Sequence, residues 1–92
     1  MNKKQQVKLH IETAEKLWNI RNYLLLNKDI LCKNKIDTRR YFESLRNIED
    51  IKNKLDDEYH KVVSENEFKK LGNVYYNQPI VNTLWLIHKK VF

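Results

Sequence analysis

This chain has very few of the residues that end helices or form tight turns. Its 92 residues include one glycine, Gly72, and one proline, Pro79, whereas good helix formers such as leucine and lysine are common. Tight hairpins and phosphate-binding loops need glycine, because glycine adopts positive φ angles without steric cost. The composition therefore predicts a largely helical protein and excludes the P-loop, GxGxxG and GxSxG classes of enzyme.

Cysteine and long apolar runs are also scarce. The single cysteine, Cys32, excludes an intramolecular disulfide, so nothing indicates a secreted, disulfide-stabilised domain. The longest apolar runs, 24–26 and 84–87, are far shorter than the roughly 20 residues that cross a bilayer. The first sixteen residues match neither a secretory signal nor a transit peptide. We therefore expect an intracellular protein, cytoplasmic by default, without a transmembrane segment.

Positive charge is concentrated in the first third of the chain. Eighteen Lys and Arg residues against twelve Asp and Glu residues give a net charge of +6. Residues 1–36 contain eight basic and three acidic residues, whereas residues 37–64 contain six and seven. Such a charge attracts nucleic acid, anionic membranes and acidic proteins. The candidate residues for binding nucleic acid or an acidic partner are Lys3, Lys4, Lys8, Lys16, Lys28, Lys33, Lys35, Arg39 and Arg40.

Apolar residues recur at helical spacing in two long segments. In the first, 3–26, the stripe consists of Val7, Ile11, Ala14, Trp18 and Leu25, widened by Leu17 and Leu24. In the second, 38–63, a cap at Asp37 or Thr38 precedes a stripe that only Lys52 interrupts. Between them, polar residues break the pattern, so we expect a loop with about one helical turn at 30–32.

Capping signals place a shorter third helix. Ser64 and Glu67 have the spacing of a capping box, which predicts a helix over 65–71. Gly72 follows Leu71, where a left-handed carboxyl-terminal cap is expected. An extended link over 73–76 is expected next.

The last sixteen residues have two readings. Asn77 and Pro79 are typical of a helix start, and the apolar residues that follow form a wide helical stripe. An alternating apolar or β-branched pattern is also present, which fits a strand paired with 74–76; its members are Val81, Thr83, Trp85, Ile87 and Val91. Two isolated strands make a poor sheet, so we favour a helix over 79–91.

These patterns predict an all-α fold in one domain, 1–92. We expect a small antiparallel helical bundle of three to four helices with one long central helix. The helices are predicted at about 3–26, 38–63, 65–71 and 79–91. The alternative is an α+β fold with a carboxyl-terminal hairpin at 74–91.

No group of residues has the spacing of a catalytic or metal site. Asp56 and His60 share a helix face, but a zinc site needs three or four converging ligands. His10 and His88 have no Ser, Cys or Asp partner at the spacing of a known motif. We therefore expect no enzymatic activity, and we predict no cofactor or metal.

Large apolar side chains near the carboxyl terminus are the candidate partner-binding residues. They are Tyr75, Tyr76, Trp85, Leu86 and Phe92. Aromatic residues dominate binding hot spots, because they bring a large area at low entropic cost. The core of a small domain needs aromatic residues too, so the sequence leaves open which of them are core and which are interface.

We expect a non-enzymatic, small basic helical protein that docks on a larger protein or ribonucleoprotein. It would act as an adaptor, inhibitor or accessory subunit, anchored by its carboxyl-terminal aromatic residues and oriented by its basic amino-terminal third. The alternative is a nucleic-acid-binding protein that uses this basic third. Self-association is a further option for such a small domain.

Overall fold

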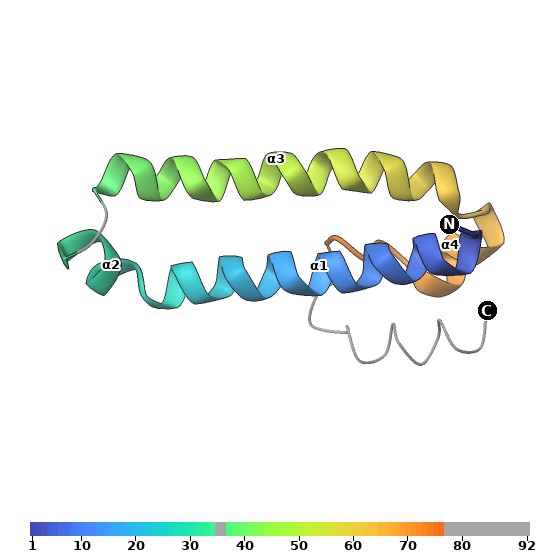
Figure 1. The fold of residues 1–92 in the computed structure, drawn as a ribbon, viewed down its shortest axis with the longest axis horizontal. Helices are drawn as coiled ribbons and strands as arrows, with labels where there is room; N and C mark the ends of the chain where they lie inside the picture. The colour runs from blue at the N-terminus through green and yellow to red at the C-terminus, as the bar shows by residue number, and fades with distance from the viewer. Residues whose placement is uncertain (35–36, 77–92) are drawn as a thin grey trace.

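Two long antiparallel helices form the body of the protein (Figure 1). The computed structural model describes residues 1–34 and 37–76. Helix α1 (Lys3–Leu26) packs along α3 (Thr38–Val62), while α2 (Lys28–Asn34) lies between them in the chain and α4 (Glu65–Leu71) follows α3. The described residues contain no strand, so the all-α prediction is confirmed.

Side chains cap the helices at the predicted places. The Arg40 N–H donates to the Asp37 carboxylate at 2.9 Å, so Asp37 is the cap of α3. The capping box of α4 is confirmed: the Glu67 N–H donates to the Ser64 hydroxyl at 3.2 Å, and the Ser64 N–H donates to the Glu67 carboxylate at 2.8 Å. Helix α3 ends one residue earlier than the predicted range, at Val62.

Gly72 ends α4 with a backbone conformation that only glycine adopts easily. Its φ of 73° is positive, as in the predicted left-handed cap, but its ψ of −164° lies outside the left-handed helical region, so the predicted cap conformation is wrong in ψ. Residues 73–76 then form a turn, in which the Tyr76 N–H donates to the Asn73 carbonyl at 3.0 Å. This turn replaces the extended link expected there, and also the strand that the alternative hairpin places at 74–76. The helix predicted at 79–91 lies outside the described residues.

The segment between the long helices corrects a second expectation. It contains a seven-residue helix, α2, rather than a loop with about one helical turn. The Asn27 N–H donates to the Tyr23 carbonyl at 3.1 Å, and the Asn27 carbonyl accepts from the Leu31 N–H at 3.0 Å. Asn27 therefore ends α1 and starts the next helix at once.

The buried apolar core lies at the α4 end of the two long helices. It joins the first half of α1, the last turns of α3, α4 and the turn after it. Its buried members are Val7, Ile11, Ala14, Tyr59, Val63, Leu71, Val74 and Tyr75. At the α2 end, the Tyr41 hydroxyl donates to the Leu24 carbonyl at 2.9 Å and ties the two long helices together.

Candidate docking surface

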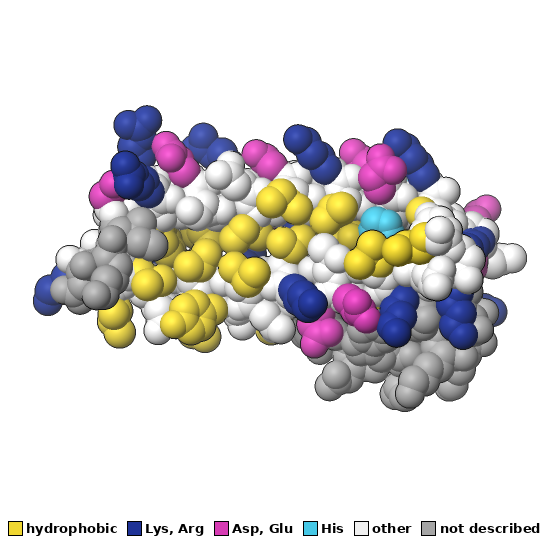
Figure 2. Space-filling model, in the orientation of Figure 1, with side chains coloured by type: hydrophobic (Ala, Val, Ile, Leu, Met, Phe, Trp, Pro, Cys, Tyr) yellow, Lys and Arg dark blue, Asp and Glu magenta, His cyan; other side chains and the backbone are white. Residues whose placement is uncertain are grey.

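One face of the α1–α3 pair carries a strip of apolar side chains that is open to solvent. Figure 2 shows hydrophobic side chains gathered along the groove between the two helices, bordered by charged side chains of both signs. From their helical positions we assign to this face three residues that are about half exposed: Leu9 at 49%, Ile20 at 52% and Ile51 at 46%. With the half-buried Leu17 and Leu55, we call them the apolar strip.

Helical spacing explains why these five side chains share one face. Leu9, Leu17 and Ile20 are eight and three residues apart, so they lie on one side of α1. Ile51 and Leu55 are four apart on α3. The strip therefore receives apolar side chains from about three turns of α1 and about one turn of α3.

An ion pair links the two long helices. The Arg21 Nε lies 3.2 Å from a Glu49 carboxylate oxygen, so Arg21 bridges α1 to α3. This ion pair shows which residues of the two antiparallel helices lie opposite one another. Ile20 precedes Arg21 and Ile51 follows Glu49 by two residues, so Ile20 lies roughly across from Ile51. In Figure 1, α4 and the turn after it pass behind α1, whereas the apolar strip faces the viewer in Figure 2.

Tyr75, one of the candidate partner-binding residues, is a core residue. Its side chain is only 1% exposed and packs against Tyr59 and His10. The Tyr75 hydroxyl lies 2.5 Å from the His10 Nδ1 atom. A buried hydroxyl needs an acceptor, so we assign this nitrogen as unprotonated and Tyr75 as the donor.

Tyr76 is exposed, as an anchor for a partner must be, but it also has contacts within the chain. Its hydroxyl donates to the Asn53 side-chain oxygen, and the Lys52 Nζ atom lies 4.7 Å from its ring centre. Lys52 lies 3.3 Å from Glu49 as well, so an aromatic ring and a carboxylate stabilise the one cation in the apolar stripe of α3. The other three predicted anchors, Trp85, Leu86 and Phe92, lie outside the described residues.

The predicted basic residues do not form one patch. Lys3, Lys4 and Lys8 lie at the start of α1, whereas Lys28, Lys33, Arg39 and Arg40 lie at the other end of the hairpin, roughly 30 Å away at 1.5 Å per residue. Lys16 lies between them, and Lys35 is outside the described residues. The structure therefore offers two smaller groups of cations.

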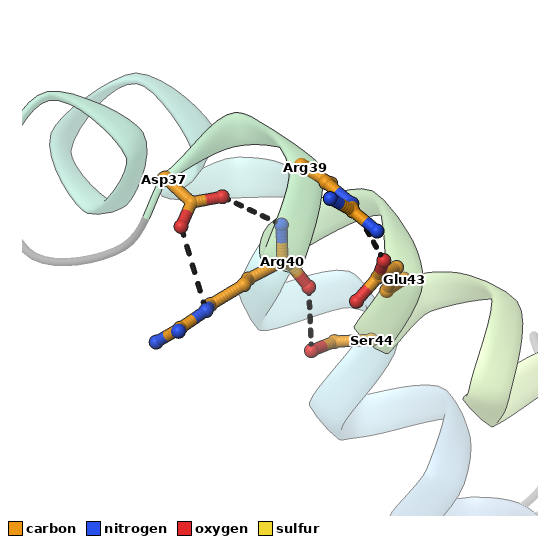
Figure 3. Close-up of polar contacts among 5 residues, drawn as sticks. All are labelled: Asp37, Arg39, Arg40, Glu43 and Ser44. Carbon is orange, nitrogen blue, oxygen red and sulfur yellow. Dashed lines mark hydrogen bonds and ion pairs between the residues drawn. The ribbon is translucent and has the colours of Figure 1, made fainter.

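Several of these cations already have partners. Figure 3 shows the start of α3, where Arg39 pairs with Glu43 at 3.1 Å and Arg40 pairs with Asp37 at 3.5 Å. The Ser44 hydroxyl donates to the Arg40 carbonyl at 2.9 Å in the same turn. Elsewhere Lys3 pairs with Glu67, whose pKa is raised by burial but lowered overall by hydrogen bonds from Lys3 and Ser64. A phosphate would have to compete with these carboxylates.

Burial shifts the titration of the core polar groups. Burial lowers the pKa of His10, and the Glu58 carboxylate opposes this shift only in part. Burial also raises the pKa of the Tyr59 and Tyr75 hydroxyls. The Tyr59 hydroxyl donates to the Gly72 carbonyl at 3.0 Å. At neutral pH these groups are therefore uncharged and serve to hold the turn after α4 on the long helices.

The pair Asp56 and His60 does not complete a metal site. The His60 Nδ1 atom lies 3.6 Å from an Asp56 carboxylate oxygen and 2.7 Å from the Asp56 carbonyl, to which it donates. Burial raises the pKa of Asp56, and the nearby His60 opposes this shift. Within residues 1–34 and 37–76, no three His, Cys, Asp or Glu side chains converge as metal ligands.

Neither long helix is apolar enough, over the part of the chain that the structure describes, to cross a membrane. Comparison with protein families, curated proteins and solved structures finds no match to this chain. The apolar strip is therefore the strongest indication of function that the molecule itself offers.

Proposed function

We propose that this protein is a small, non-enzymatic docking protein. It binds a larger protein or ribonucleoprotein through the apolar strip and acts as an adaptor, inhibitor or accessory subunit, inside the cell. The observation that carries the proposal is the half exposure of Leu9, Ile20 and Ile51 on one face of two packed helices. A contiguous apolar patch with a charged border is typical of a protein-binding surface.

The strip changes the mechanism that the sequence suggests. The anchoring area moves from the carboxyl-terminal aromatic residues to the groove between α1 and α3, because Tyr75 is buried. Tyr76, Trp85, Leu86 and Phe92 remain predicted contributors. The two groups of cations at the ends of the hairpin would orient an acidic partner by complementary charge, which affects the association rate more than the affinity.

Nucleic-acid binding through the basic amino-terminal third is the second proposal. Its support is the net charge of +6 and the exposed Lys8, Lys16 and Lys33. The separation of the basic residues into two groups, and the carboxylate partners of Arg39 and Arg40, weaken this support. Phosphate contacts release counterions, so this mode of binding would weaken steeply as salt concentration rises.

A capture experiment with matched variants tests the docking proposal. The full chain is used to capture partners from native lysate, with and without nuclease, alongside Ile20→Lys and Ile30→Lys. Ile30 is 64% exposed and lies on α2, outside the strip, so it controls for added charge and lost apolar area. We expect Ile20→Lys to lose a nuclease-resistant partner that Ile30→Lys retains. Equal capture by both variants would refute docking through the strip.

A further inference from the structure

A titratable contact ties the turn after α4, residues 73–76, to helix α1. The Tyr75 hydroxyl donates to the His10 Nδ1 atom at 2.5 Å, although the two residues are 65 apart in sequence. Val74 and Tyr75 are buried, and Figure 1 shows the turn running beside the first half of α1. We propose that this contact is a pH-sensitive latch: it holds the turn on α1 while His10 is neutral and releases it when His10 takes up a proton.

The chemistry of the imidazole ring decides where that proton binds. In a neutral histidine, one ring nitrogen carries a hydrogen and the other has a free lone pair. The buried Tyr75 hydroxyl uses the lone pair of Nδ1, so the hydrogen of the neutral ring is on Nε2. A second proton can therefore bind only at Nδ1. It takes the lone pair that the tyrosine needs, and the hydroxyl hydrogen is left without its acceptor.

The surroundings of the ring also disfavour a positive charge. The centre of the His10 ring lies 5.6 Å from that of Tyr59 and 5.7 Å from that of Tyr75. Burial among these side chains lowers the pKa of His10. The Glu58 carboxylate favours the charged ring, but it is exposed and lies 3.0 Å from the Lys61 Nζ atom, so solvent and a lysine weaken its effect. Protonation therefore works against the closed latch twice, through the lost acceptor and through the buried charge.

Release of the turn is a smaller event than unfolding of the domain. The two long helices pack against each other along their length, and this packing does not require the turn. Opening the latch exposes Val74 and Tyr75 and leaves the α1–α3 pair in place. Local openings of this kind cost less free energy than global unfolding, so acid should open the latch before it unfolds the helices.

The direction of the pH effect follows from the two states of His10. In the released state the ring is in water and has the ordinary pKa of about 6.5, whereas burial lowers the pKa in the latched state. Above that pH neither state binds the proton, and the latch has its full strength. Below it the released state binds the proton first. The ratio of released to latched molecules then rises by up to about tenfold per pH unit, until the lowered pKa of the latched state is reached.

Other titratable groups surround the latch on the elements packed against it. They are Asp56, Tyr59 and His60 on α3, Glu67 on α4 and Lys3 on α1. The Tyr59 hydroxyl stays uncharged in acid, because burial raises its pKa and it donates to the Gly72 carbonyl. A variant that changes His10 alone retains all of these groups, so their titration cancels in a comparison with the original chain.

Amide hydrogen exchange of the full chain, followed by NMR at about pH 7.5 and about pH 5.5, tests the latch. The amides to follow are those of Gly72 and Tyr76, which donate to the Phe68 and Asn73 carbonyls. After correction for the intrinsic pH dependence of exchange, we expect their protection to fall severalfold at the lower pH. Amides beside Ile48, in the middle of α3, should keep their protection.

Two variants separate the latch from other effects of acid. His10→Asn keeps an acceptor oxygen near the position of Nδ1 but does not titrate, so the protection of the two amides should not change with pH. Tyr75→Phe keeps His10 and the aromatic ring but removes the donor, so protection should be low already at the higher pH and should change less with pH. Circular dichroism spectra confirm that each variant is folded, and Tyr75→Phe carries the comparison if His10→Asn does not fold.

Three outcomes would overturn the latch: unchanged protection of both amides in the original chain, an equal fall in His10→Asn, or an equal fall along the whole of α3, which would mean global unfolding. The NMR shifts of the ring nitrogens give an independent check. A hydrogen on Nδ1 of His10 at neutral pH would contradict the direction of the hydrogen bond and overturn the latch as well. The capture experiment does not depend on any of these results, so the docking proposal is decided separately.

Discussion

The hydrogen bond from Tyr59 to the Gly72 carbonyl should contribute measurably to stability. Tyr59 is fully buried, and its hydroxyl lies 3.0 Å from the carbonyl of the residue that ends α4. Tyr59→Phe keeps the ring and its contacts but removes the donor. A neutral hydrogen bond contributes about 1 kcal/mol net, and a carbonyl left without a partner raises the expected loss to about 1–2 kcal/mol.

Urea unfolding followed by circular dichroism measures this loss. A domain of this length has a free energy of unfolding of roughly 5–14 kcal/mol, so Tyr59→Phe should remain folded at room temperature. Its melting temperature should fall by roughly 4–16 °C, since 1 kcal/mol corresponds to about 4–8 °C in a domain of this size.

The control is Tyr23→Phe, which removes the hydroxyl of an exposed tyrosine on α1 and should change stability by less than about 0.5 kcal/mol. Both variants are measured at the same low protein concentration, because self-association makes stability depend on concentration. If Tyr59→Phe and Tyr23→Phe unfold at the same urea concentration, the Tyr59 hydroxyl does not hold the turn after α4, and the role given to it here is wrong.

Three further changes test the local structure. Gly72→Ala should destabilise the protein by about 1–3 kcal/mol in urea unfolding, because a Cβ atom strains the backbone at φ 73° and ψ −164°; an unchanged midpoint would contradict that conformation. Ser64→Ala removes the cap of α4 and should cost about 1 kcal/mol, whereas Ser44→Ala, inside α3 and not at its cap, should cost less. Stability should fall as pH drops below about 6.5, because the pKa of His10 is lowered by burial and the unfolded chain binds the proton first. Subtracting the pH profile of His10→Phe isolates this contribution from those of all other groups, and parallel profiles would contradict it.

Local signals were sufficient to predict most helix boundaries. The predicted ranges 3–26 and 65–71 agree with the structure. Ser64 and Glu67 form the predicted capping box, and Gly72 follows the last residue of α4. Such signals depend on neighbours within one turn, so they can be read from the chain alone. Helix α2 was missed because Asn27 and the polar residues after it predict a break, and nothing local shows that a helix restarts at once.

The apolar strip and the core could not be separated from sequence. Leu9 and Ile20 recur at helical spacing beside the predicted stripe of α1, so a signal for a second apolar face was present. Helical spacing does not show which side of a wide stripe a neighbour covers, because that depends on contacts distant in sequence. The same limit applies to Tyr75, whose partner His10 is 65 residues away.

Because the buried side chains gather at the α4 end, the two long helices are held together unevenly. At the far end of α3, Tyr41 and Ile48 are the buried apolar side chains among the described residues. Segments with few buried contacts open more often than segments in the main core. The two long helices should therefore separate first beside α2 and stay packed together beside α4. Amide hydrogen exchange along α3 would slow progressively from Tyr41 toward Tyr59.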